Sequence, residues 1–285
     1  MFDRRDAIRV KLPAIMQCAI DLKPTRKENE VYIDRKIDVS ELVKFIEENN
    51  RKEGIHYTYF HAFLSAIGKV IYHRPKLNRF IANRHLYEHK NILLSFVAKM
   101  SLDDKAEELM LTVEIEPDDT IDTIAAKTAR KVEVLRSAQA EKKGANGAVD
   151  TLGNLPNIIR VPIFALIKLL GKFGLLPSSL TTNNIYFSSM IISNLGSIGC
   201  GAIYHNLADF GTCSALTAIG EISDEIRVDA DGKQHIAKLC EFGITLDERV
   251  GDGFYFARSV QMIEYILKHP EMLKKKIADP VDMKK

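Results

Sequence analysis

Strand-like and helical stretches alternate along most of this sequence, and few folds accommodate that order. Residues 31–38, VYIDRKID, alternate apolar and polar side chains with the period of two that is typical of a half-buried strand. Ser40 is placed to cap a short helix, and the strongly apolar residues 57–72 predict a second helix that Pro75 ends. Further strands are predicted over residues 91–97, 109–115, 185–195, 214–222 and 236–246, and further helices over residues 118–140 and 254–268.

A turn at residues 229–232, DADG, is expected to join the last two strands as a hairpin, since glycine tolerates the positive φ that such turns need. The alternation of strands with long helices predicts one two-layer α/β domain rather than two separate domains.

Composition places the chain among ordinary globular proteins. Its 285 residues are 46% hydrophobic and 27% charged, and the net charge of +2 gives no reason to expect nucleic acid as a partner. The four cysteines lack a CxxC spacing, which argues against a zinc site or a disulfide framework and suits a reducing compartment. The first residues have no apolar signal-peptide core, so a cytoplasmic protein is expected. No metal is expected, because no histidine has a metal-ligand spacing with acidic or cysteine neighbours.

Residues 157–173, NIIRVPIFALIKLLGKF, form an unusual helical stretch that is apolar around most of its circumference. A membrane span needs roughly 20 uninterrupted apolar residues, and two lysines and a proline interrupt this run. We therefore expect a buried helix or an oligomer contact. The alternative is peripheral membrane contact by a helix in the lipid interface, because Arg160, Lys168 and Lys172 gather towards one face. Residues 141–148, EKKGANGA, predict a flexible loop before it.

The segment TLDERVGDGFYFAR, residues 245–258, resembles the signature of chloramphenicol acetyltransferases and of the acyltransferase subunits of 2-oxo-acid dehydrogenase complexes. Those families read His-x-x-x-Asp-Gly, and the histidine is their general base. Asp252 and Gly253 match the signature, but Glu248 stands at the histidine position. The run ISNLG at residues 192–196 and the helix ending at Pro75 are also similar to the dehydrogenase-complex enzymes, and these matches follow the family's order.

The resemblance implies an α/β fold of the chloramphenicol acetyltransferase type (an α+β two-layer sandwich), with a mixed sheet and helices on one side. It implies a single catalytic domain over residues 1–285, with an apolar helical insertion at about 150–182. A lipoyl or subunit-binding domain is not expected, because the matches begin at about residue 31. It further implies acyl transfer from a thioester to a hydroxyl or thiol of a small-molecule acceptor, in a channel between the subunits of a homotrimer. Coenzyme A would carry the acyl group as a co-substrate, not as a tightly bound cofactor.

Glu248 decides how much of that chemistry can be transferred to this chain. A solvated glutamate has a pKa of about 4.3 and is a poorer base than a histidine with a pKa of about 6.5, although burial in an apolar channel would raise it. Glu248 is therefore a working base, a ligand-binding group, or a relic in a catalytically inactive homologue that binds a ligand or partner through the same channel. His205 is the alternative base.

Other candidate roles follow from the resemblance. A serine hydroxyl would donate to the oxyanion of the tetrahedral intermediate, a role that falls on Ser193, with Ser189 or Asn194 as alternatives. Asp252 would hold the catalytic loop by pairing with an arginine near the N-terminus, and Gly253 would allow a tight turn or close packing at the start of the last helix. The candidate arginines are Arg5 and, as alternatives, Arg4 and Arg9.

Overall fold

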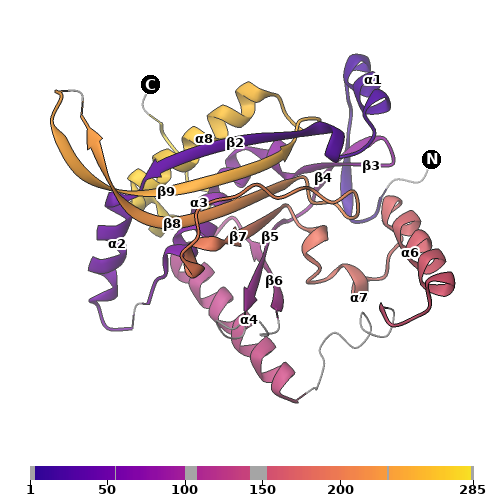
Figure 1. The fold of residues 1–285 in the computed structure, drawn as a ribbon, viewed down its shortest axis with the longest axis horizontal. Helices are drawn as coiled ribbons and strands as arrows, with labels where there is room; N and C mark the ends of the chain where they lie inside the picture. Colours follow the sequence, from indigo (N-terminus) through magenta and orange to yellow (C-terminus); the bar gives the residue numbers. More distant parts are fainter. Residues whose placement is uncertain (1–3, 55, 100–107, 142–152, 230, 284–285) are drawn as a thin grey trace.

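A six-stranded mixed sheet forms the centre of the computed structural model, which describes residues 4–54, 56–99, 108–141, 153–229 and 231–283. Its strand order is β2-β9-β8-β7-β5-β6, and β1, β4 and β3 form a second, three-stranded sheet (Figure 1). Strand β7 runs parallel to both of its neighbours, while the other pairs of the large sheet are antiparallel. The strands are β1 (Ala7–Val10), β2 (Glu30–Asp38), β3 (Arg79–Ala82), β4 (His85–His89), β5 (Ile92–Lys99), β6 (Glu108–Ile115), β7 (Met190–Asn194), β8 (Ala215–Val228) and β9 (Gln234–Asp247).

Helices α2 (Ser40–Asn50), α3 (Tyr59–His73) and α8 (Gly253–Lys268) cover one face of this sheet and enclose the main core (Figure 1). Helix α4 (Ile121–Glu141) contacts α3 and β6, and α1 (Ala14–Leu22) lies near the N-terminus. Thr58 fixes the start of α3 by accepting a hydrogen bond from the His61 backbone, which satisfies one of the free N–H groups of the first turn. The predicted two-layer arrangement, with helices on one side of a mixed sheet, is confirmed.

The predicted hairpin joins β8 and β9 through the turn that begins at Asp229. The Asp229 carboxylate accepts hydrogen bonds from the backbones of Asp231 and Lys233, and Gly232 adopts a φ of 79°. Two local predictions are wrong. Ser40 is the first residue of α2 and not its cap, because its N–H and hydroxyl bond to Asp38. The strand predicted from residue 185 begins only at Met190, after a 3-10 turn at Ile185–Phe187.

Helix α6 (Asn157–Lys172) lies at one end of the molecule, followed by the short α7 (Ser178–Thr181) (Figure 1). Gly171 is the only residue within α6 that is buried in the chain, so the expectation of a buried helix is wrong. Within the described ranges, no helix is long and apolar enough to cross a membrane. The loop predicted at residues 141–148 lies, beyond Glu141, outside the residues that the structure describes.

Candidate active site

A cavity of about 250 Å³ lies beside Ser193. Ser193 belongs to β7, where Ile192 points into the helix-covered core and Ser193 therefore faces the opposite side of the sheet. The lining is mostly apolar and comes from β5, β7, β8, the turn before β7, and the loop between β7 and β8; it includes Val97, Tyr186, Ile191, Ser193, His205, Leu207, Cys213 and Leu216. Burial raises the pKa of the Cys213 thiol, which favours its neutral form. The cavity thus combines apolar walls with a few polar groups, as ligand sites commonly do.

The loop that brings His205 to this cavity crosses the large sheet on the face opposite the helices. Two glycines within the strands allow the backbone of this loop to lie directly against the sheet. A Cβ at Gly220 would lie 2.7 Å from the Ala202 nitrogen, and one at Gly243 would clash with the Ile203 carbonyl. Glycine inside a strand marks such approaches of another backbone.

His205 is the histidine that lines this cavity, and the residue is partly exposed. Its Nε2 is buried and has no hydrogen-bond partner among the described residues. Leaving such a group unpaired costs about 1–3 kcal/mol, so a ligand that bonded to it would recover that energy. Ser193 and the alternative base His205 therefore line one cavity, as a base and an oxyanion donor would need to.

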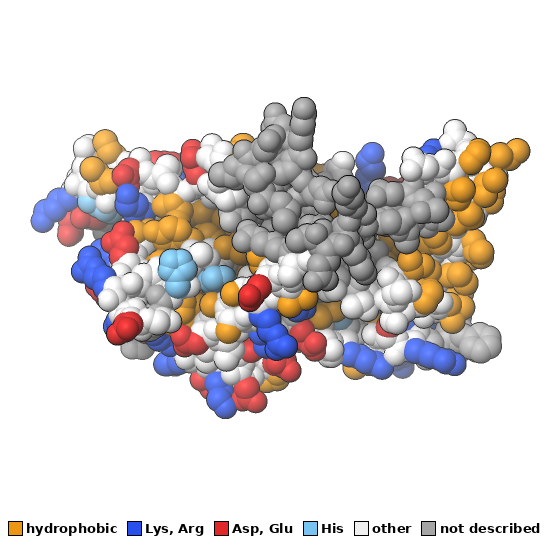
Figure 2. Space-filling model, turned by 90° about the horizontal axis from the view of Figure 1, so that it is seen from below, with side chains coloured by type: hydrophobic (Ala, Val, Ile, Leu, Met, Phe, Trp, Pro, Cys, Tyr) orange, Lys and Arg blue, Asp and Glu red, His pale blue; other side chains and the backbone are white. Residues whose placement is uncertain are grey.

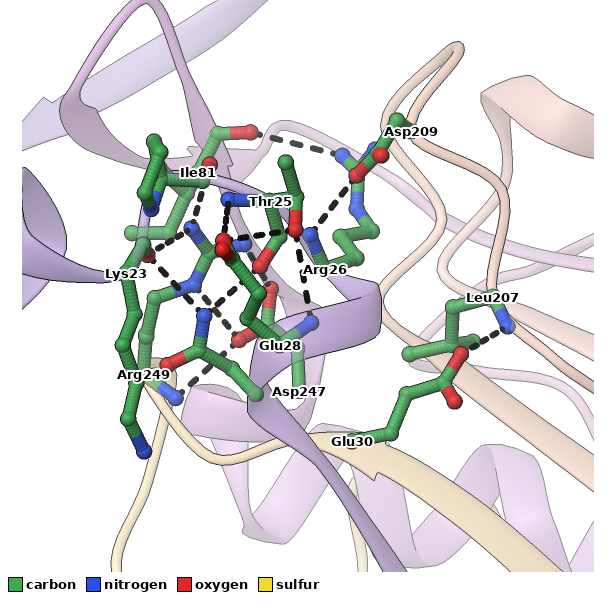
Figure 3. A network of polar contacts seen from close by, with 12 residues as sticks. Lys23, Thr25, Arg26, Glu28, Glu30, Ile81, Leu207, Asp209, Asp247 and Arg249 are labelled. Atoms are coloured by element: carbon green, nitrogen blue, oxygen red, sulfur yellow. Dashed lines mark hydrogen bonds and ion pairs between the residues drawn. The ribbon is translucent and has the colours of Figure 1, made fainter.

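Two charged residues before and within β2 hold the His205 loop in place (Figure 3). The buried Arg26 donates from its guanidinium to the carbonyls of Ala208 (2.8 Å) and Gly211 (2.9 Å), and its backbone N–H bonds to Asp209. The Glu30 carboxylate accepts from the Leu207 backbone at 2.6 Å. The position of His205 therefore depends on the segment that precedes β2.

The two residues that flank Glu248 in the sequence have a structural role. Asp247 and Arg249 form a buried ion pair, with Arg249 donating to both carboxylate oxygens at 2.8 and 2.7 Å. The same guanidinium donates to the carbonyls of Lys23 and Pro24 and so fixes the segment that leads to Arg26 (Figure 3). The signature loop and the His205 loop are thus joined through one polar network.

Glu248 lies between these two residues but points elsewhere. Its side chain is 45% exposed and pairs with Lys23 at 3.2 Å. It lines a different cavity, of about 270 Å³, between α1 and the end of β9. Within one chain, Glu248 and Ser193 therefore do not share a cavity.

The remaining predicted residues are scattered. Asp252 is exposed and caps α8 by accepting from the Tyr255 N–H at 2.8 Å, a bond that lowers its pKa. Its ion pair is with Lys76 at 3.7 Å, so the predicted pair with Arg5 is wrong. Arg4 instead binds Asp6 and the Gly171 carbonyl.

Gly253 has open space where a Cβ would lie and no positive φ, so the expectation of close packing there is wrong as well. Ser189 is buried and accepts from the Leu93 N–H, which gives it a structural role. Asn194 follows Ser193 on the other side of β7 and is not part of the cavity lining. No cluster of metal-ligating side chains occurs in the part of the chain that the structure describes.

Comparisons with known proteins agree with this architecture. Residues 177–274 match the family of the 2-oxoacid dehydrogenases acyltransferase (catalytic domain). The fold is similar to a probable dihydrolipoamide acetyltransferase from Listeria monocytogenes, at 15% identity and a TM-score of 0.58 over 91% of this chain and 94% of that one. It is also similar to the cubic core of the pyruvate dehydrogenase multienzyme complex, at 17% identity and a TM-score of 0.59 over 93% of each chain.

A chloramphenicol acetyltransferase matches at 10% identity and a TM-score of 0.57, over 92% of this chain and all of that one (100%). No curated protein matches the sequence significantly. The predicted resemblance in fold to these acyltransferases and to chloramphenicol acetyltransferase is therefore confirmed over nearly the whole chain, and residues 177–274 also resemble the acyltransferase catalytic domain in sequence.

Sequence reasoning missed Arg26 and Glu30, which position the His205 loop. Both lie in a stretch of alternating charges, PTRKENE, that is typical of a solvated surface. The glycines of β8 and β9 were the available signal, since glycine is unfavourable inside a strand unless another backbone comes close.

Proposed function

We propose that this protein transfers an acyl group from a thioester of the acyl-CoA type to a hydroxyl or thiol acceptor, in the cavity lined by Ser193 and His205. The observation that supports this most is the buried, unpartnered Nε2 of His205 in the same cavity as Ser193. The match of residues 177–274 to an acyltransferase catalytic domain supports the reaction class.

In the proposed reaction, neutral His205 takes the proton from the acceptor O–H or S–H as the acceptor oxygen or sulfur attacks the thioester carbonyl carbon. The carbonyl oxygen becomes an oxyanion and accepts a hydrogen bond from the Ser193 hydroxyl, which is most valuable because the charge exists only in the tetrahedral state. The C–S bond then breaks, and the departing thiolate takes the proton back from the imidazolium. The acceptor leaves acylated and the thiol leaves protonated.

The apolar walls of the cavity would strengthen these interactions by excluding water. Coenzyme A would be the thiol leaving group of an acyl-CoA co-substrate. We also propose that the protein is a cytoplasmic homotrimer.

A second candidate is a catalytically inactive homologue that binds a ligand or partner through this cavity. The exposed Glu248, paired with Lys23 where relatives carry the catalytic histidine, favours it. The two candidates differ in turnover, so a direct assay separates them.

Thiol release from acetyl-CoA and longer acyl-CoAs, measured with hydroxyl, thiol and amine acceptors, tests the proposal. We expect His205→Gln to lower kcat by roughly 10²–10⁴-fold and Ser193→Ala by roughly 10²–10³-fold. Glu248→Gln is the matched control and should stay near wild type. If Glu248→Gln lost turnover while His205→Gln kept it, Glu248 and not His205 would be the general base. Absence of turnover in wild type, with activity appearing in Glu248→His, would establish the inactive homologue.

A further inference from the structure

Helix α6 presents an apolar surface to solvent that no described part of the chain covers. Its outward residues are large and aliphatic or aromatic, and Leu169 is 53% exposed. Figure 2 shows hydrophobic side chains gathered at the end of the molecule where α6 lies. We call this set the α6 surface: Ile158, Ile159, Leu166, Leu169 and Phe173.

The α6 surface forms one continuous stripe. At about 100° per residue, its members and Pro162 lie within an arc of roughly 100° on the helix. The helix is held to the body from the other side, where Gly171 is buried and its carbonyl accepts from Arg4 at 2.6 Å. The stripe therefore faces away from the protein on a helix that is anchored at its C-terminal end.

The charges carried by α6 itself are all positive, and the carboxylate beside its C-terminal end, Asp6, is paired with Arg4. Residues 153–184 contain no aspartate or glutamate, while Arg160, Lys168 and Lys172 lie in α6. Arg160 bonds to the Gly153 carbonyl and to Asn157. Neither lysine forms an ion pair with a described residue. At about 100° per residue, Lys172 lies about 40° and Lys168 about 80° from the near edge of the stripe, both on the same side of it. Lysine and arginine side chains follow one edge of the hydrophobic end in Figure 2.

We infer that the α6 surface docks on an anionic lipid surface, with the stripe in the lipid interface and Lys168 and Lys172 at the headgroups. A helix of this length spans only about 24 Å, shorter than the roughly 30 Å of a bilayer core, so it lies along the membrane and does not cross it. Apolar side chains bordered by lysines suit this position, because the long stems stay among apolar groups while the ammonium reaches the phosphates. Residues 153–184 contribute no carboxylate that an anionic surface would repel, and the nearby Asp6 carboxylate is paired with Arg4 at 2.6 Å.

Co-sedimentation with vesicles tests this inference on the intact protein. Phosphatidylcholine vesicles are compared with vesicles in which one part of the lipid is replaced by phosphatidylglycerol, and Leu169→Glu is compared with Ile226→Glu. Ile226 is a matched control, because it is 69% exposed and lies on β8 far along the chain from α6. Circular dichroism checks that each variant remains folded.

Wild type and Ile226→Glu should bind the anionic vesicles, and Leu169→Glu should bind at least about tenfold more weakly. Lys168→Ala and Lys172→Ala should each weaken binding by about fivefold, and added salt should weaken it further. The inference is overturned if wild type ignores anionic vesicles, or if Leu169→Glu and Ile226→Glu bind alike. It is also overturned if Leu169→Glu changes only the oligomer size in gel filtration, which would assign the α6 surface to a second copy.

Discussion

Asp247 and Glu248 are neighbours in the sequence with opposite environments, and removing one charge from each should have very different effects on stability. The Asp247 side chain is fully buried (0% exposed) and its partner Arg249 is 4% exposed. Asp247→Asn keeps the shape but leaves the Arg249 guanidinium as a buried charge without its counter-ion. Breaking a buried pair from one side typically costs about 3–5 kcal/mol.

Glu248→Gln removes an exposed pair with Lys23 instead, and such pairs contribute about 1 kcal/mol or less. At roughly 2–4 °C per kcal/mol for chains of 150–250 residues, Asp247→Asn should lower the Tm by about 10 °C and Glu248→Gln by about 2 °C. Urea unfolding followed by circular dichroism, at one fixed protein concentration, gives the free energies directly.

The reasoning would be refuted if both variants unfolded at the same urea concentration with unchanged m-values. It would also be refuted if Glu248→Gln were the more damaging change, since that would place Glu248 in a buried environment of an assembly. For Asp247→Asn we expect a loss in the free energy of unfolding at the low end of the range of about 3–5 kcal/mol. The reason is that the Lys23 and Pro24 carbonyls still accept hydrogen bonds from Arg249.

Three further predictions concern a histidine, the strand and turn glycines, and the cysteines. Burial lowers the pKa of His89 to about 4, below its ordinary value of 6.5. As the pH falls, the unfolded chain therefore binds a proton before the folded chain does, and the free energy of unfolding should decrease by about 3 kcal/mol between about pH 6.5 and pH 4. Urea unfolding of wild type and His89→Gln across that range measures this decrease. Gly243→Ala should displace the loop at Ile203 and lower both stability and acyl transfer, whereas Gly232→Ser in the exposed turn should lower stability by about 1 kcal/mol and leave kcat unchanged. An aromatic disulfide reagent should label the exposed Cys18 and Cys200 in the folded protein, and the buried Cys213 and Cys240 only after unfolding. Labelling of all four thiols in the folded protein would contradict this burial pattern.

The fold was predictable because the patterns that define it are local. The period of two in β2 and the apolar run of α3 each depend on neighbouring residues, and the turn at Asp229 carries its own chemistry. The burial of α6 was not predictable in the same way, since an apolar circumference says only that a helix favours an apolar contact. Whether the chain itself supplies that contact depends on its tertiary arrangement.

The candidate site was harder to predict than the fold, because its residues come together only through long-range contacts. Ser193 and His205 could each be named from the sequence, yet their shared cavity depends on the crossing of the His205 loop over β8 and β9. The predicted partner of Asp252 failed for a related reason: many exposed cations can approach a carboxylate, and only the fold selects Lys76.

The buried network around position 248 places no constraint on the side chain at that position. Asp247 and Arg249 hold the carbonyls of residues 23 and 24, and Arg26, two residues further on, holds the His205 loop. This buried network requires a carboxylate and a guanidinium on either side of position 248 but makes no demand on the side chain at 248 itself, which is exposed. A substitution at position 248 should therefore cost little stability. Because the same network positions His205, weakening it in Asp247→Asn should lower acyl transfer through His205 even where the variant is still folded.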